Sequence, residues 1–216
     1  ELGKDNPNPN YVDTLAEVYK NLSIAAESAG DSAGVKSNAL LAAQNFQRAS
    51  DLQYGSAPQI LGAAGMYERA GQMDKAAECY EVLMKARLDP KLHAQVKNNL
   101  AMAIVRSGDT SKLERAAALI NEAIQLFPHP AFFDTLGWIE LDRGRPQQAI
   151  DAFTKSIQLN ETEKKADFPS PRIGRAIALL QVSDAGRTEA KGVLDSLAKV
   201  KLDADEAKRL EQLRKL

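Results

Sequence analysis

Three glycines recur at nearly equal intervals along this chain. Gly71, Gly108 and Gly144 stand 37 and 36 residues apart, and each follows a segment of helical apolar spacing that has a polar end. Glycine closes a helix in the left-handed conformation at no steric cost, which makes it the usual residue at that place. A period of this length predicts helix-turn-helix units, each of which buries its apolar face only by stacking on its neighbours.

Three units carry the repeat clearly, over Ile60 to Arg87, Lys97 to Phe127 and Phe133 to Asn160. In each unit a small alanine follows the glycine, and a larger apolar residue comes four positions later on the same helix face. We expect the alanines where the two helices of a hairpin approach most closely, with the larger residues filling the space beside them. These pairs are Ala76 with Tyr80, Ala116 with Ile120, and Ala149 with Phe153. The middle unit has three extra residues between its glycine and its alanine.

The last of these units resembles the tetratricopeptide repeat, a helical hairpin of about 34 residues. It departs from the family pattern at Glu140, where the family prefers Tyr, and at Glu161, where it prefers Pro. The resemblance implies an all-α fold, a right-handed α-solenoid of stacked antiparallel hairpins. The matching residues are Phe133, Leu136, Gly137, Gly144, Ala149, Phe153 and Ile157.

Weaker units of helical apolar spacing flank these three on both sides. At the far end, acidic residues precede an amphipathic segment that is typical of the capping helix of a solenoid. We therefore expect a flexible leader over 1–10 and one solenoid domain over 11–216. Its approximate repeats are 11–52, 57–88, 94–128, 130–161 and 169–200, and its capping helix is 203–215.

In such an array the first helices of successive hairpins line a concave groove, where members of the family commonly bind a peptide or a partner helix. On these first helices, residues three or four apart should face this groove when they lie opposite the packed side, which carries Phe133 and Leu136 in the fourth unit. We interpret it as an apolar floor with Trp138 as its anchor, since Trp and Met are favoured at binding surfaces. The alternative, that these side chains pack between neighbouring helices or under the cap, stays equally open. The candidate partner-binding residues are Gln95, Asn98, Asn99, Met102, Arg106, Asp134, Thr135, Trp138, Leu141 and Ile177.

One family subtype clamps a carboxylate at the end of a peptide with Lys, Asn and Arg side chains from three repeats. Asn99 matches the middle asparagine of this clamp. Leu61 and Gly65 stand where the preceding repeat needs Lys and Asn, and Ala131 and Thr135 stand where the following repeat needs Lys and Arg. Four of the five positions fail, so we reject carboxylate clamping.

Composition argues against several other functions. The formal net charge is −1, whereas nucleic-acid binding needs clustered Lys and Arg. No run of eighteen apolar residues exists, so we expect no membrane insertion. The one cysteine, Cys79, excludes an intramolecular disulfide, and the two histidines, His93 and His129, stand in different repeats. We expect no catalytic residue, no metal site and no cofactor, and hence no enzyme.

The sequence thus predicts a protein-protein interaction scaffold or adaptor that binds a protein or peptide partner in a concave groove. The alternative is a structural or oligomerisation module of a larger protein or assembly, and a homo-oligomer is compatible with either. The style of the segment from Asp134 to Trp138 resembles bacterial repeat arrays more than eukaryotic co-chaperones. A cytoplasmic and a periplasmic location both stay open, because many periplasmic proteins also lack disulfides.

Overall fold

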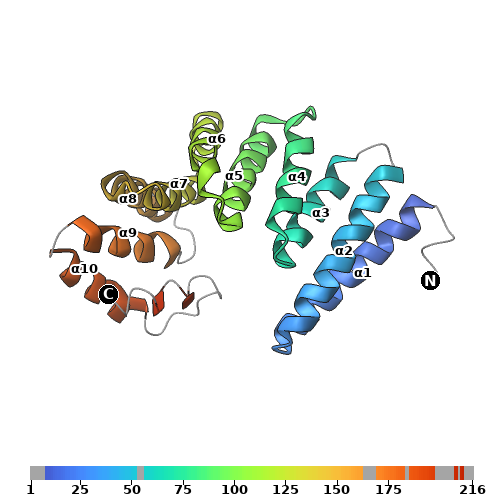
Figure 1. Ribbon diagram of the computed structural model, residues 1–216, viewed down its shortest axis with the longest axis horizontal. Helices are drawn as coiled ribbons and strands as arrows, with labels where there is room; N and C mark the ends of the chain where they lie inside the picture. Colours follow the sequence, from blue (N-terminus) through green and yellow to red (C-terminus); the bar gives the residue numbers. More distant parts are fainter. Residues whose placement is uncertain are drawn as a thin grey trace. The chain divides into compact units, whose positions relative to one another are not determined.

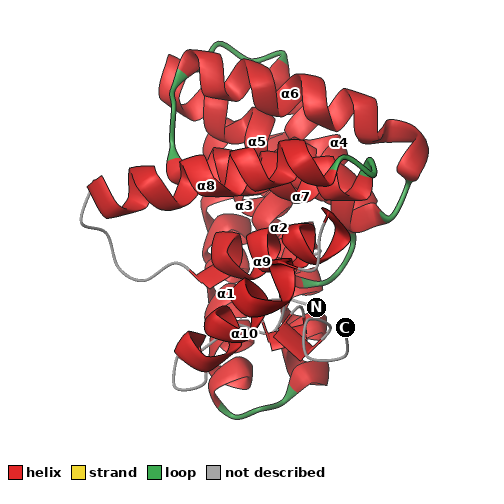
Figure 2. Ribbon diagram, turned by 90° about the vertical axis from the view of Figure 1, so that its left-hand side faces the viewer, coloured by secondary structure: helices red, strands yellow, loops and turns green. Residues whose placement is uncertain are grey.

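A computed structural model describes residues 8–52, 56–162, 169–182, 185–197, 207, 208, 210 and 211 (Figure 1). Every regular element among these residues is a helix, and Figure 2 shows helices and connecting loops only. The chain forms two compact units, Glu1–Gly108 and Asp109–Leu216, and each is described by itself. The described part is therefore all-α, as the sequence predicts.

Among its described residues the first unit contains five helices, and each of the first four packs against the next along the chain. Helices α1 and α2 form one antiparallel hairpin, α3 and α4 form a second, and α5 follows on α4. Asn8 and Asp89 begin α1 and α5 by accepting a hydrogen bond from the backbone of the first turn. The bounds are α1 Pro9–Ser28, α2 Ser32–Leu52, α3 Ala57–Arg69, α4 Met73–Met84 and α5 Pro90–Ser107.

The second unit contains the remaining helices, again packed in chain order, with α9 also touching α7. Prolines stand in the first turn of α7, α8 and α9, where the missing backbone N–H leaves nothing unpaired. A short 3-10 helix, η1, precedes α6 and accounts for the three extra residues after Gly108. The bounds are η1 Thr110–Lys112, α6 Leu113–Leu126, α7 Pro130–Asp142, α8 Pro146–Thr162, α9 Pro169–Val182 and α10 Ala185–Leu197.

Glycines close the helices as expected. Gly71, Gly108 and Gly144 have φ values of 79°, 76° and 69°, and Gly30 adds a fourth at 74°. After Gly30, Gly71 and Gly144, the next backbone N–H returns to a carbonyl five residues earlier, for example from Gln72 to Tyr67 at 2.8 Å. This is the Schellman closure, which satisfies carbonyls that the helix end leaves open. The same closure thus joins the helices of three hairpins.

The expected small and large pairs lie in the core. Ala76 and Tyr80 are buried in the first unit, and Ala116, Ile120, Ala149 and Phe153 are buried in the second. In the first unit the ring of Phe46 on α2 lies 3.2 Å from the place where a Cβ of Gly62 on α3 would be. The two neighbouring hairpins of this unit therefore approach each other closely at a small residue, Gly62.

The expected capping helix, 203–215, falls largely outside the described residues. Ala207, Lys208, Leu210 and Glu211 are described, and all four are helical. Leu210 is buried in the core cluster of the second unit together with Leu197 of α10. The apolar side of this segment therefore meets the last hairpin at Leu210.

Candidate functional site

An apolar recess lies between α3 and α5, the two helices that flank α4 in the first unit. Its volume is about 170 Å³, and each residue that lines it is apolar. Leu83 of α4 is almost fully buried there, whereas Pro58 of α3 remains exposed. An apolar cavity of about 150 Å³ is large enough for a benzene ring, so this recess has room for one large apolar side chain. The lining residues are Ala57, Pro58, Leu61, Leu83, Leu92 and Val96.

A chain of polar side chains continues from this recess along α3 and α5. The hydroxyl of Tyr80 donates to Oε1 of Glu68 at 3.0 Å and accepts from Nδ2 of Asn99 at 3.4 Å. Nδ2 of Asn98 donates to Oδ1 of Asn99 at 3.1 Å. Oδ1 of Asn98 is buried and accepts no hydrogen bond from the described residues. Three helices therefore hold these four side chains in one hydrogen-bond network, in which Oδ1 of Asn98 is an unpaired acceptor among the described residues.

Burial dominates the electrostatics of this network. It raises the pKa of the Glu68 carboxyl, although the hydrogen bond from Tyr80 and the charge of Arg106 act in the opposite direction. Burial also raises the pKa of the Tyr80 phenol, and the neighbouring Glu68 adds to this effect. Tyr80 therefore stays protonated at neutral pH and remains available as a donor to Glu68.

Four of the five candidate residues on α5 lie along one side of the helix, and the fifth, Asn98, lies beside them. Gln95, Asn99, Met102 and Arg106 follow each other at intervals of four, three and four residues, which places them along one side of the helix. Gln95 and Arg106 are exposed, and Asn99 and Met102 are half-buried. Asn98 stands about 100° further round the helix and is also half-buried. The structure thus leaves this side of α5 accessible.

The candidate residues on α7 are buried instead. The side chain of Trp138 is 7% exposed, and its indole N–H donates to Oγ of Ser170 on α9 at 3.1 Å. The same hydroxyl donates to Oδ2 of Asp134 at 2.9 Å. The Trp138 ring meets Phe153 of α8 edge-on, with 5.2 Å between ring centroids. Thr135 is buried as well, and it donates to a carbonyl of its own helix.

The structure therefore buries Trp138 between α7, α8 and α9 and does not leave it open on the floor of a groove. Helix α9 packs against α7, and Ser170 ties Asp134 and Trp138 to it. Leu141 and Ile177 are partly buried against the same cluster. The alternative raised from the sequence, packing between neighbouring helices, describes these residues. The accessible candidates of this site are consequently those on α5.

No family model matches the sequence, and no curated protein matches it, but solved structures do. One is TTC0263, a thermophilic tetratricopeptide-repeat (TPR) protein of Thermus thermophilus. Its TM-score is 0.64 at 16% identity, covering 93% of this chain and 100% of that one. The chain has the tetratricopeptide-repeat fold.

Two further structures support the same fold. The pilF protein of Pseudomonas aeruginosa has a TM-score of 0.59 at 21% identity, with 94% of this chain and 85% of that chain covered. A chain of the APC/C hetero-tetramer Cut9-Hcn1 has a TM-score of 0.64 at 15% identity, with 96% of this chain and 40% of that chain covered. At such identities the likeness concerns the fold.

The departure of this TPR fold from its family pattern at Glu140 has a structural reason. Glu140 is buried, and its Oε1 lies 2.6 Å from Nη1 of Arg143. Arg143 also donates through Nε to Oε1 of Glu114 on α6 at 3.0 Å, and through Nη2 to the other oxygen of Glu114. These ion pairs link α6 to the end of α7. Residue spacing shows only the pair within α7, so the sequence did not reveal the link to Glu114.

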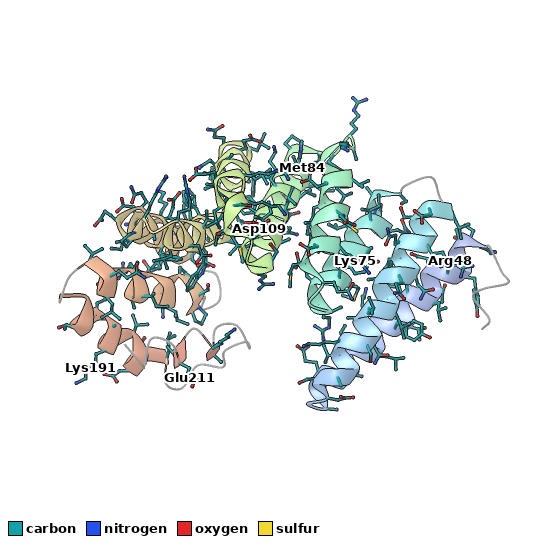
Figure 3. All side chains as sticks on the ribbon, viewed as in Figure 1. Arg48, Lys75, Met84, Asp109, Lys191 and Glu211 are labelled. Atoms are coloured by element: carbon teal, nitrogen blue, oxygen red, sulfur yellow. The ribbon has the colours of Figure 1, made fainter. Side chains whose placement is uncertain are left out.

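A second hollow lies on the other side of α3, between α2 and α4. Its volume is about 420 Å³, and its lining includes Asp51, Glu78 and Cys79. Lys75, labelled in Figure 3, places its ammonium 5.5 Å from the centre of the Tyr67 ring. Burial raises the pKa of the Cys79 thiol to about 11, so the thiol stays protonated and unreactive at neutral pH. The lining of this hollow thus mixes charged, polar and apolar side chains.

The residues that the structure describes include neither a metal-binding cluster nor a membrane-spanning helix. Among those residues no group of three or more His, Cys, Asp or Glu side chains could hold a metal ion. None of the described helices is both long enough and apolar enough to span a bilayer.

Proposed function

We propose that this chain is a protein-interaction scaffold that holds an extended peptide or a helix of a partner on the face of α3 and α5. The observation that carries the proposal is that the apolar recess lies next to the polar network of Glu68, Tyr80, Asn98 and Asn99. Gln95, Asn98, Asn99, Met102 and Arg106 keep their place in the proposed site. Peptide-binding grooves combine pockets for side chains with polar groups that meet the peptide backbone.

The separation between the recess and Asn99 suits an extended peptide segment. Leu92 borders the recess, and Asn99 follows seven residues later on the same helix, which is about 10 Å along its axis. An extended peptide covers that length in about three residues. We therefore propose an apolar partner residue in the recess, followed about three positions on by a backbone group that hydrogen-bonds to Asn98 or Asn99.

The site is organised before the partner arrives, which favours binding. Asn99 is held by Tyr80 and Asn98, and Tyr80 is held by Glu68. Side chains that are already ordered lose less conformational entropy when a partner binds. The Cut9-Hcn1 hetero-tetramer contains a chain of the same fold within a protein assembly, and this supports a role in protein assembly for the present chain too.

The test is a selection of binding peptides from a random library against the full chain, with affinities then measured for the wild type and for three variants. Leu61→Glu and Asn99→Ala should weaken binding about tenfold, the loss expected for a contact worth about 1.4 kcal/mol. Val82→Glu is the matched control, because Val82 is exposed and lines the second hollow instead. Peptides that bind all four proteins equally, or a selection that yields none, would refute the proposal.

A second candidate function is an oligomerisation module. The exposed apolar residues of α1 favour it, since they lie outside the proposed peptide site.

A further inference from the structure

An exposed apolar row runs along α1. Val18 and Leu22 expose 47% and 46% of their surface, and Leu15 is half-buried beside them. The row continues with Ala25 and Ala29, so its members follow each other at intervals of three, four, three and four residues. These intervals are those of the seam of a coiled coil, in which one helix packs along another.

The row lies on the side of α1 that faces away from α3. Helix α3 meets the opposite side of α1, where Gln59 donates to Asp13 and Arg69 donates to Ser23 and Glu27. At about 100° per residue, that side lies about 150° round α1 from the row. Among the described residues of this unit, the stacked hairpins therefore leave the row uncovered.

Leu41 of α2 extends the apolar row into a face of the whole hairpin. It is 39% exposed, and it lies on the side of α2 away from Phe46, which packs on Gly62 of α3. Oγ of Ser23 donates to the carbonyl of Val35 at 2.9 Å, which sets the pairing of the two antiparallel helices. Counting outward from that bond puts Val18 and Leu41 at about the same level. We call this surface, made of Leu15, Val18, Leu22, Ala25, Ala29 and Leu41, the end face.

The charges of α1 avoid the end face. The helix has four charged residues, and all of them lie on its other side. Lys20 pairs there with Glu17 at 2.6 Å, while Asp13 and Glu27 bond to α3. The positions that flank the row at intervals of seven are uncharged, namely Thr14, Asn21 and Ser28. Two α1 helices can therefore meet along this row without opposing like charges.

The sizes of the side chains along the row indicate how two copies would meet. The row is bulky at its start, at Leu15, and small at its end, with Ala25 and Ala29, and Tyr11 stands four residues before Leu15 on the same side of the helix. An antiparallel pairing about a point between Val18 and Leu22 sets Leu15 against Ala25 of the partner and Tyr11 against Ala29 of the partner. A parallel pairing would set large against large and leave the alanines facing a gap.

We propose that a second copy of this chain docks on the end face, in a two-fold dimer whose α1 helices run antiparallel. A two-fold interface uses the same patch on both protomers, so the patch must complement itself. The row on α1 does so in charge and in bulk. Val18 of each protomer packs against Leu22 of the partner at the centre of this interface. The proposed dimer is independent of the peptide site between α3 and α5.

The test measures the mass of the full chain by light scattering over a range of concentrations up to its solubility limit. The wild type should shift toward twice the mass of one chain, and both Val18→Glu and Leu22→Glu should keep the mass of one chain. The control is Ile24→Glu, because Ile24 is as exposed as Leu22, at 47%, yet lies on the charged side of α1. Circular dichroism of each variant verifies that it is folded.

A mixing experiment tests the orientation. In an antiparallel pair Lys at position 18 of one protomer meets Glu at position 22 of the other, so a mixture of the Val18→Lys and Leu22→Glu chains should dimerise when neither does alone. A parallel pair brings these charges to different levels and gains nothing. A wild type that stays monomeric at all concentrations would overturn the proposal. So would a dimer that survives Leu22→Glu, one that Ile24→Glu breaks equally, or a mixture that stays monomeric.

Discussion

A Cβ atom on Gly174 of α9 would stand 2.3 Å from the ring of Phe153 on α8, which is closer than such atoms pack. Gly137 of α7 approaches the same ring, with a corresponding distance of 2.4 Å. Phe153 is fully buried. Helices α7 and α9, the first helices of two successive hairpins, therefore both contact the ring of Phe153. They can do so because each has a glycine at the point of contact. This contact joins the fourth and fifth repeats.

Gly174→Ala should destabilise the second unit by about 1–3 kcal/mol, the usual cost of adding a methyl group to a packed core. The measurement is unfolding in urea followed by circular dichroism. Gly192→Ala on α10 is the control, because a Cβ there meets nothing within 4 Å and Ala is the better helix former. Equal stability of the two variants would contradict the close packing on Phe153.

Trp138→Ala should lower stability by about 3–5 kcal/mol, since it empties a packed site between α7, α8 and α9. Peptides selected on the α3 and α5 face should bind this variant as tightly as the wild type, provided the measurement is made where it remains folded. A stable Trp138→Ala protein that has lost its peptide would restore Trp138 as a binding residue. The two readouts therefore separate packing from binding.

Arg143→Met should cost about 3 kcal/mol, because it removes the close partner of the buried Glu140 carboxylate and leaves, among the described residues, only Arg145, whose Nη1 lies 3.9 Å from Oε2 of Glu140. The double variant with Glu140→Met should recover most of this loss, since two apolar side chains need no ion pair. Glu114→Gln should cost less than about 1 kcal/mol, because Glu114 is exposed. A double-mutant cycle by urea unfolding measures the coupling, and additive losses would show that Glu140 and Arg143 act separately.

The buried carboxyl of Glu68 should make stability depend on pH. Its pKa is raised in the folded chain, so the folded state binds more protons than the unfolded state from about pH 4.5 upward. The contribution of this carboxyl group to the free energy of unfolding is fully present below that pH. It is lost as the pH rises through the pKa that the group has in the folded state.

Glu68→Gln removes this loss and can still accept the hydrogen bond from Tyr80. The wild type should therefore lose stability relative to the variant between about pH 4.5 and neutral pH, as measured by urea unfolding at several pH values. A difference that does not change over this range would show that burial does not shift the Glu68 titration.

The sequence predicted the helices and their closures well, because both depend on neighbouring residues. Gly71, Gly108 and Gly144 have positive φ as expected, and η1 occupies the three extra residues after Gly108. The sequence did not decide which of the candidate site residues are accessible. Asn99 and Met102 lie on an accessible side of α5, whereas Trp138 is buried. Both sets occupy comparable places in their repeats, so periodicity alone could not separate them.

The sequence by itself determined the all-α repeat, the turns and the small contacts within hairpins, because helical spacing and left-handed glycines act over a few residues. Only the tertiary structure decided which side chains stay accessible. Ser170 of α9 reaches across to Trp138 and Asp134 and covers them, while Leu61 and Leu92 border an open recess. Exposure depends on residues far apart in the chain that meet only after the helices have packed, and no local pattern contains that information.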